Sequence, residues 1–429
     1  MQQSVAAAVG GRARQAAAWR PRLPSFAPLR RASFRWLWAG MGASYAGDRL
    51  QQLAQAWLVA TLTHSALGVG LISAFGSLAQ LLMPLGGVVA DQVDRRRLVL
   101  TGQFLGGAAA TVLAALVLTG HVVFWYIYIW AFVSGLVWLI SRPAYKVLLT
   151  NAVPREEVQS AVAINAMTET AEGTLVNAGG SLLLAAVGLP VAFVLNAVSY
   201  FVAAFTVGKL PGLDPPATAK PALAPGQIFG DLREGLRYLR SQPALLYPML
   251  ISWATAVCAA PALSLLAAIV RRGGGTVVAY GMLAASVGVG SFLGAAYAGS
   301  HADGAQRLRQ YAQLTVLAAV ALVLFVVFPL GAASVLPLAA IGFTYFCESV
   351  WNKSRVRHLA PDAYQGRLQS LVTMTATLGF PIGALWGGAA VDRFGVHALL
   401  GGAVALAVLA AATIVVGERM CRSAAAGVA

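Results

Sequence analysis

The stretch GGVVADQVDRRRLVL, residues 86–100, concentrates charge in a chain that otherwise carries little of it. Only 10% of the 429 residues are charged and 59% are hydrophobic, yet residues 91–97 hold two aspartates and three consecutive arginines. Long apolar runs lie on both sides of this cluster. Because a bilayer-spanning helix needs roughly 20 mostly apolar residues, we interpret the cluster as a hydrophilic loop between two membrane spans.

Working outward from this loop, charge clusters and Gly/Pro-rich breaks divide the chain into twelve apolar segments of spanning length. They fall at about 34–62, 67–90, 98–119, 122–146, 160–186, 188–210, 245–270, 277–299, 309–330, 332–356, 367–391 and 395–417. The sequence therefore predicts an all-α membrane protein.

One long connection divides the twelve segments into six and six. Its first half is rich in Pro and Ala, and its second half, residues 231–240, predicts a basic amphipathic helix on the membrane surface. We expect six-helix bundles at 34–210 and 245–417, separated by a cytosolic loop at 211–244. A basic cytosolic arm at 1–33 and a cytosolic tail at 418–429 complete the chain.

Lysine and arginine are distributed very unevenly between the two sides of the predicted spans. Of the 30 basic residues, 26 fall on one side and three on the other, and Arg49 lies within a span. Basic loops stay in the cytosol, so both termini are expected there. The net charge of +15 is explained by these flanking residues, and we expect a lipid bilayer, not a nucleic acid, as the large partner.

The two halves of the chain repeat one pattern. GVVADQVDRRR (87–97) aligns with GSHADGAQRLR (299–309) at an offset of 212, and at an offset of 207 Pro154, Gly180 and Gly188 align with Pro361, Gly387 and Gly395. Repeats in the same orientation are related by an axis along the membrane normal. The repeat predicts two pseudo-symmetric bundles.

The 87–97 segment resembles the signature G-x-x-x-D-x-x-G-R-R of the major facilitator superfamily, with Asp94 in place of the second Gly. The resemblance covers essentially the whole chain and implies the major facilitator fold of twelve helices. YAGD in the first span, RPAYKVLLTNAVPREEVQSA after the fourth and GDLREGLRYLRSQPAL before the seventh are similar to one branch. That branch contains bacterial siderophore exporters of the enterobactin and alcaligin type and macrolide efflux pumps.

The charged loop and its second copy predict a gating latch on the cytosolic side. A carboxylate just past the end of the second span can face the N-terminus of a neighbouring helix, where it is favoured, and a following arginine can pair with it. Anchoring of the loop by its positive charge is the alternative. The latch candidates are Gly87, Asp91, Asp94, Arg95, Arg96, Asp303 and Arg307.

Carboxylates inside the spans are candidates for carrying a proton, because an ionisable residue in the membrane is costly and usually functional. Asp48 lies near the middle of the first span, on a face shared with Tyr45, Gln52 and Gln55. A structural ion pair with Arg49 or a neighbouring span is the alternative. The further proton-coupling candidates are Glu348, Glu169 and Glu172.

Polar and aromatic residues of the spans are candidates for lining a substrate cavity, although membrane tryptophans often serve as interfacial anchors instead. The cavity candidates are Tyr45, Gln52, Gln55, Trp138, Arg142, Trp253, Tyr345 and Asn352. For Arg142, extension of the charge toward the membrane surface is an equal alternative.

The sequence contains no phosphate-binding loop, no metal triad and no nucleophile–base arrangement, so we expect neither an enzyme nor a cofactor or metal. The resemblance implies a monomeric, proton-coupled exporter of a small polar metabolite in the bacterial inner membrane, with a siderophore as the favoured cargo. The alternatives are a macrolide-type drug pump and, less favoured, a membrane sensor that has lost transport.

Overall fold

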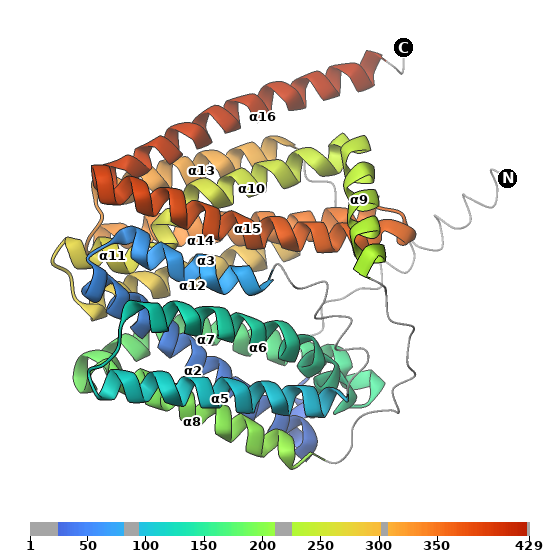
Figure 1. Cartoon of the computed structure of the whole chain (residues 1–429). Coiled ribbons are helices and arrows are strands. Elements are labelled where there is room, and N and C mark those ends of the chain that lie inside the picture. The colour runs from blue at the N-terminus through green and yellow to red at the C-terminus, as the bar shows by residue number, and fades with distance from the viewer. Residues whose placement is uncertain (1–24, 81–93, 211–224, 302–307, 427–429) are drawn as a thin grey trace.

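The computed structural model describes residues 25–80, 94–210, 225–301 and 308–426, and helices account for nearly all of them (Figure 1). No β-strand occurs in these ranges. The long helices of the first half are α2 (Ala32–Thr63), α3 (Ala66–Gln80), α5 (Arg95–Leu118), α6 (Phe124–Asn151), α7 (Val158–Val187) and α8 (Pro190–Gly208). Those of the second half are α10 (Pro243–Ser264), α12 (Val277–Ser300), α13 (Leu308–Val327), α14 (Val335–Leu359), α15 (Asp362–Phe394) and α16 (Leu400–Ala426), and the short helix α11 (Leu266–Arg272) follows α10.

Within the described residues, nine helical segments are long and apolar enough to cross a membrane. Helices α2 and α7 are as long as their neighbours, with 32 and 30 residues, but they carry the charges of Asp48, Arg49, Glu169 and Glu172. At 1.5 Å per residue, both still exceed the ~30 Å of a hydrocarbon core. Helix α3 is described for only 15 residues. A helix thus lies at each of the twelve expected segments.

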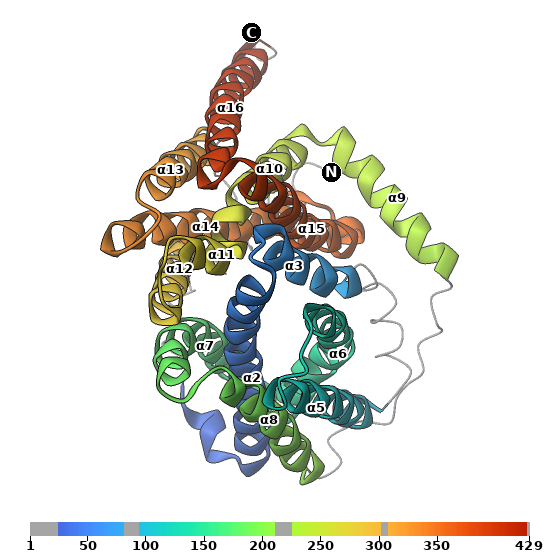
Figure 2. The ribbon, with the colours of Figure 1, turned by 60° about the vertical axis from the view of Figure 1, so that its left-hand side comes forward.

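The helices form two bundles, which confirms the predicted fold class (Figure 2). In the first bundle α8 packs against α2 and α5, and α5 packs against α6. In the second, α14 packs against α12, α16 against α13, and α15 against α10. Two helix pairs make the most extensive contacts between the bundles: α3 with α15, and α7 with α12. Helix α11 also contacts α2.

Glycines allow the two bundles to approach closely at both joints. A Cβ added at Gly70 of α3 would lie 2.6 Å from the carbonyl oxygen of Ala384, and one at Gly388 of α15 would lie 2.7 Å from Cα of Leu67. At the other joint, a Cβ on Gly281 of α12 would lie 2.5 Å from the carbonyl oxygen of Asn177. Small residues let membrane helices pack backbone to backbone in this way.

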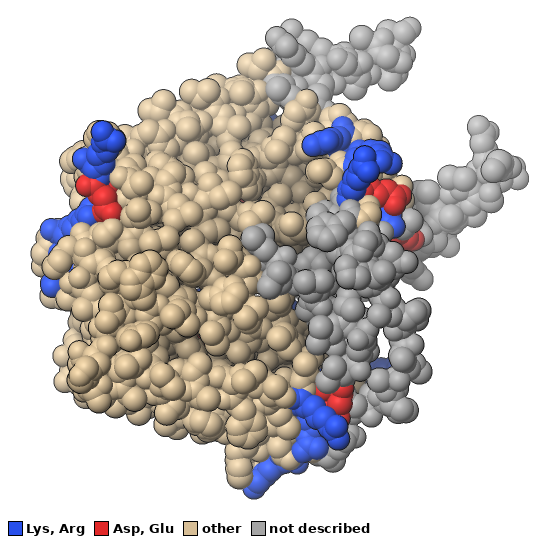
Figure 3. All heavy atoms as spheres, viewed as in Figure 1, with Lys and Arg blue, Asp and Glu red and all other residues tan. Residues whose placement is uncertain are grey.

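Charged side chains gather at two opposite ends of the molecule, and a broad uncharged band separates them on the face in view (Figure 3). We call these ends the α11 end, which carries Arg271, Arg272 and Arg393, and the α9 end, which carries Arg96 and Lys209. Apolar side chains of the long helices are also exposed, among them Leu175 of α7 at 68% and Val404 of α16 at 63%. Exposed apolar surface of this kind is suited to lipid.

Helix α9 (Pro225–Ser241) is the amphipathic helix expected in the central connection. It packs along the start of α15, where the Tyr238 and Tyr364 rings stack with centroids 4.3 Å apart. Arg367 forms an ion pair with Glu234 at 2.8 Å. The helix is therefore attached to the second bundle, outside the helices that cross the band (Figure 2).

Candidate functional site

A central cavity of about 440 Å³ lies between the two bundles. The first bundle contributes residues of α2, α3 and α6, and the second contributes residues of α10, α12 and α15. A second chamber of about 200 Å³ adjoins it and shares four lining residues, Arg49, Gln52, Leu263 and Tyr280. Four of the residues predicted from the sequence line the larger chamber: Asp48, Gln52, Gln55 and Trp138.

Asp48 lies in the cavity wall with its carboxylate directed into its own bundle. Its side chain is 7% exposed. It accepts hydrogen bonds from Nδ2 of Asn196 at 3.1 Å and from Nε1 of Trp138 at 3.4 Å. The amide of Asn196 also donates to Oε1 of Gln51 at 2.8 Å. Asp48 is therefore held by neutral donors and not by the ion pair with Arg49 that the sequence left open.

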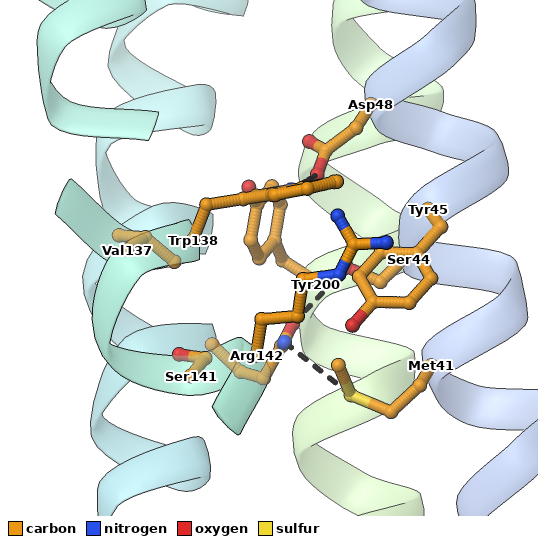
Figure 4. Close-up of a pocket in the computed structure, with 10 residues that line it drawn as sticks. Met41, Ser44, Tyr45, Asp48, Val137, Trp138, Ser141, Arg142 and Tyr200 are labelled. Carbon is orange, nitrogen blue, oxygen red and sulfur yellow. Dashed lines mark hydrogen bonds between the residues drawn. The ribbon is translucent and has the colours of Figure 1, made fainter. Parts of the chain in front are cut away.

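Trp138 separates Asp48 from a second charged group (Figure 4). The guanidinium carbon of Arg142 lies 4.0 Å from the centre of the Trp138 ring, on a cation–π contact. The Tyr45 ring lies 5.7 Å from the Trp138 ring. These residues line a pocket of only about 10 Å³ beside the main cavity. Tyr45 and Arg142 therefore lie behind the Trp138 ring and do not line the main cavity.

Arg142 is already neutralised by Glu169. Its Nη2 lies 2.7 Å from Oε2 of Glu169, and Nδ2 of Asn165 donates to the other carboxylate oxygen at 2.9 Å. Tyr145 donates to Oδ1 of Asn165 at 2.6 Å. Glu169 is thus fixed in a satisfied network that links α6 to α7, which is a less suitable setting for proton exchange than that of Asp48.

Glu172 lies one helical turn beyond Glu169 on α7. A Cβ added at Gly42 of α2 would come within 3.4 Å of its Oε1 atom. Glu172 is half-buried and forms no ion pair within the described residues. It does not line either of the two chambers.

The candidates of the second half meet in a separate small pocket of about 20 Å³. Glu348, Trp253, Tyr345 and Asn352 all line it. Glu348 is 1% exposed, and its Oε1 atom has no hydrogen-bond partner within the described part of the chain. Glu348 is therefore buried inside the second bundle and does not line either of the two chambers.

The predicted latch is only partly within the described residues. Gly87, Asp91, Asp303 and Arg307 lie outside them. Asp94 caps α5 by accepting from the backbone N–H of Arg97 at 3.0 Å. Arg96 donates to the carbonyl oxygens of Val207 and Gly208 at the end of α8, where a cation is favoured. The contacts described for Asp94 and Arg96 therefore lie within the first bundle; Arg95 is half-buried.

Sequence reasoning missed a second group of charged residues, which closes the α11 end. Oδ1 of Asp392, at the end of α15, accepts from the backbone N–H of Ala66 at 2.7 Å. Oδ2 accepts from the hydroxyl of Ser65 at 2.6 Å and from the N–H of Leu67 at 3.0 Å. A residue of the second bundle thus caps the first turn of a helix in the first bundle.

Arg272 completes this closure. It forms an ion pair with Asp392 and donates to the carbonyl oxygens of Val391, at 3.1 Å, and His64, at 2.9 Å. Within the described residues, every hydrogen bond found between the bundles involves Asp392 or Arg272. The signal available in the sequence was an isolated acidic residue among the three arginines of the sparsely charged side.

Two helical bundles around a cavity, joined by polar contacts at one end, are the architecture of a membrane transporter. The chain belongs to the transmembrane secretion effector family of major facilitator transporters, which matches residues 23–426.

Relatives of known name agree with this assignment. The enterobactin exporter EntS of Shigella flexneri is 27% identical over 324 residues, which is 75% of this chain and 76% of EntS. Among solved structures, the nucleoside transporter NupG has a TM-score of 0.71 at 14% identity and covers 89% of this chain and 99% of NupG. A bacterial homologue of the lysosomal transporter Spinster has a TM-score of 0.70 at 13% identity, over 90% and 96% of the two chains. Those two structures share the fold.

Proposed function

We propose that this chain is a proton-coupled exporter of a small polar metabolite and that it works by alternating access. A siderophore is the favoured cargo. The observation that carries the proposal is the central cavity, which has the buried carboxylate of Asp48 in its wall and a seal at one end. The enterobactin exporter is the relative that supports a siderophore as cargo.

The proposed energy source follows from the carboxylates in and near the cavity. The sequence has no nucleotide-binding motif, so an ion gradient is the remaining source of energy for uphill transport. A carboxyl group moved between a wet and a dry environment changes its affinity for protons. Asp48 is our first candidate for the proton carrier, and Glu348 is the second.

Orientation is the first testable part of the proposal. We propose that the chain lies in the bacterial inner membrane as a monomer, with the α9 end and both termini in the cytosol, because basic residues accumulate on that side. Single cysteines at Ser241 and Thr276, in a background without Cys258, Cys347 and Cys421, should then react with an impermeant thiol reagent from opposite faces. Reaction of both from the same face would reject the orientation.

Cargo and direction are tested in the native host. Deletion of the gene should raise the cytosolic pool of siderophore and lower the external pool, as measured by mass spectrometry. Iron uptake from supplied siderophore should stay unchanged. Complementation by the wild-type gene should restore both pools.

Two other outcomes of this experiment would change the function. Loss of uptake from supplied siderophore would identify an importer. Unchanged siderophore pools together with a large gain in sensitivity to macrolides would identify a drug pump.

A further inference from the structure

Arg49 follows Asp48 in the chain but faces a different environment. Consecutive residues of a helix point about 100° apart. Asp48 turns into its own bundle toward Asn196, whereas Arg49 is exposed to the space between the bundles and lines both chambers. A guanidinium group therefore lies where the two chambers adjoin.

Most of the hydrogen-bonding capacity of Arg49 is available to a ligand. A guanidinium carries five N–H donors. Within the described residues Arg49 makes one side-chain hydrogen bond, from Nη1 to Oε1 of Gln52 at 3.2 Å, and no ion pair. Arg142, by contrast, is already bound to Glu169. Arg49 is therefore the cation of this cavity that an incoming anion can engage.

The opposite wall of the cavity is mostly apolar, with the hydroxyl groups of Ser264 and Tyr280 as its polar groups. From the second bundle, Leu263 and Tyr280 line both chambers, Phe380 lines the larger one, and Leu266, Ala284 and Val287 line the smaller one. Among the described residues that line the two chambers, Asp48 is the only acid and Arg49 the only base. A ligand that satisfies both walls has an acidic group on one side and an apolar or aromatic body on the other.

Two further basic residues, both lysines, lie outside the lining of the two chambers. Lys146 of α6 and Lys353 of α14 occupy equivalent positions in the two halves, at the offset of 207 that relates the repeats. Both side chains are exposed. Glu172 is a carboxylate outside the two chambers. It lies beside Gly42 of α2, two helical turns from Arg49.

We propose that Arg49 is the anion-recognition residue of the central cavity, and that the site takes amphipathic anions whose aromatic or apolar part packs against Leu263, Tyr280 and Phe380. The inference rests on the proposed transport function and specifies the chemical class of its cargo. A charge-assisted pair in a partly desolvated site gives both affinity and orientation. An Arg also offers paired donors that a Lys lacks.

The test uses the purified full-length chain in lipid nanodiscs and two dyes with the same xanthene ring. Fluorescein is an anion and rhodamine 123 is a cation, and binding is measured by fluorescence polarisation. The wild-type chain should prefer fluorescein. Arg49→Gln should weaken fluorescein binding by about 10- to 100-fold, the range expected for one hydrogen bond to a charged group, and should leave rhodamine 123 binding unchanged or stronger.

Three further variants make the result specific. Arg49→Lys should retain part of the fluorescein affinity, because lysine keeps the positive charge but lacks the paired N–H donors of a guanidinium. Arg271→Gln, which removes an arginine stacked on Trp57 outside both chambers, should bind as the wild type does. Glu172→Gln should retain the preference for the anion. Elution as a single monodisperse peak in gel filtration confirms that each variant is folded.

Equal fluorescein affinity in the wild type and Arg49→Gln, a wild-type preference for rhodamine 123, or binding of neither dye would overturn the proposal. These outcomes are distinct from failure of the transport function. If the deletion strain accumulates siderophore in the cytosol but the purified chain shows no preference for the anionic dye, the export function is supported and the proposed role of Arg49 is rejected. If fluorescein binds through Arg49 while the deletion changes no metabolite pool, the anion site stands and the cargo is a different anion.

Discussion

Asp48→Asn should abolish export driven by a proton gradient while sparing exchange of substrate down its own gradient. The amide resembles the protonated acid in shape and can still accept the hydrogen bond from Nδ2 of Asn196. It cannot release a proton, however, so the step that couples proton movement to substrate movement is lost. Vesicles containing the purified chain and an imposed pH gradient measure this directly, and we expect accumulation to fall to the level seen without a gradient.

Two further variants serve as a control and as a test of the competing proton site. Glu156→Gln removes an exposed carboxylate outside the membrane spans, and it should transport as the wild type does. Glu348→Gln changes the other deeply buried carboxyl group, whose Oε1 atom has no partner in the described part of the chain. Undiminished gradient-driven accumulation by Asp48→Asn, with loss in Glu348→Gln, would move the proton site to the second bundle.

Asp392→Ala should open the α11 end of the molecule. The side chain is bound to Ser65, Ala66, Leu67 and Arg272, and the first three belong to the opposite bundle. Loss of a helix cap alone costs about 0.5–2 kcal/mol, and each 1.4 kcal/mol changes an equilibrium constant about tenfold. Because these contacts exist only while the end is closed, their full loss shifts the balance toward the open state.

The shift is measured by labelling a single cysteine at Ser73, in the wall of the larger chamber. The background lacks Cys258, Cys347 and Cys421, and an impermeant thiol reagent is added at the face that carries the α11 end. Asp392→Ala should be labelled about tenfold faster than the parent. Arg272→Gln should show a similar gain, and the double variant should add little, because the two residues act as one unit.

Arg393→Gln serves as the matched control. Arg393 is the next residue along the chain and is exposed at the same end, where it stacks on Phe394 and does not join the bundles. It should label as the parent does. Labelling of Asp392→Ala at the parental rate would show that the glycine-mediated contacts of α3 with α15 hold the end closed without the charged group.

The two bundles of helices could be predicted from the sequence because the signal is local. A run of about 20 apolar residues has few alternatives to a helix in a membrane, and charges or Gly/Pro breaks mark where each run ends. The regular charge pattern of residues 231–240 predicts α9 for the same reason. The candidates Asp48, Gln52, Gln55 and Trp138 could likewise be chosen from the rarity of polar groups within spans, and the structure brings all four to one cavity.

The roles of individual charged residues could not be predicted from the sequence. Asp48 and Arg49 are neighbours in sequence, so pairing between them was a reasonable alternative; instead, Asn196 of α8 turns the carboxylate into the bundle and leaves the guanidinium at the cavity. The closure at the α11 end joins Asp392 to residues more than 320 positions away. Hydropathy acts along the chain, so the sequence alone determines the spans and their order. Hydrogen bonds and ion pairs act over about 3 Å in space, so only the packing of distant helices decides which charges close the molecule and which face a ligand.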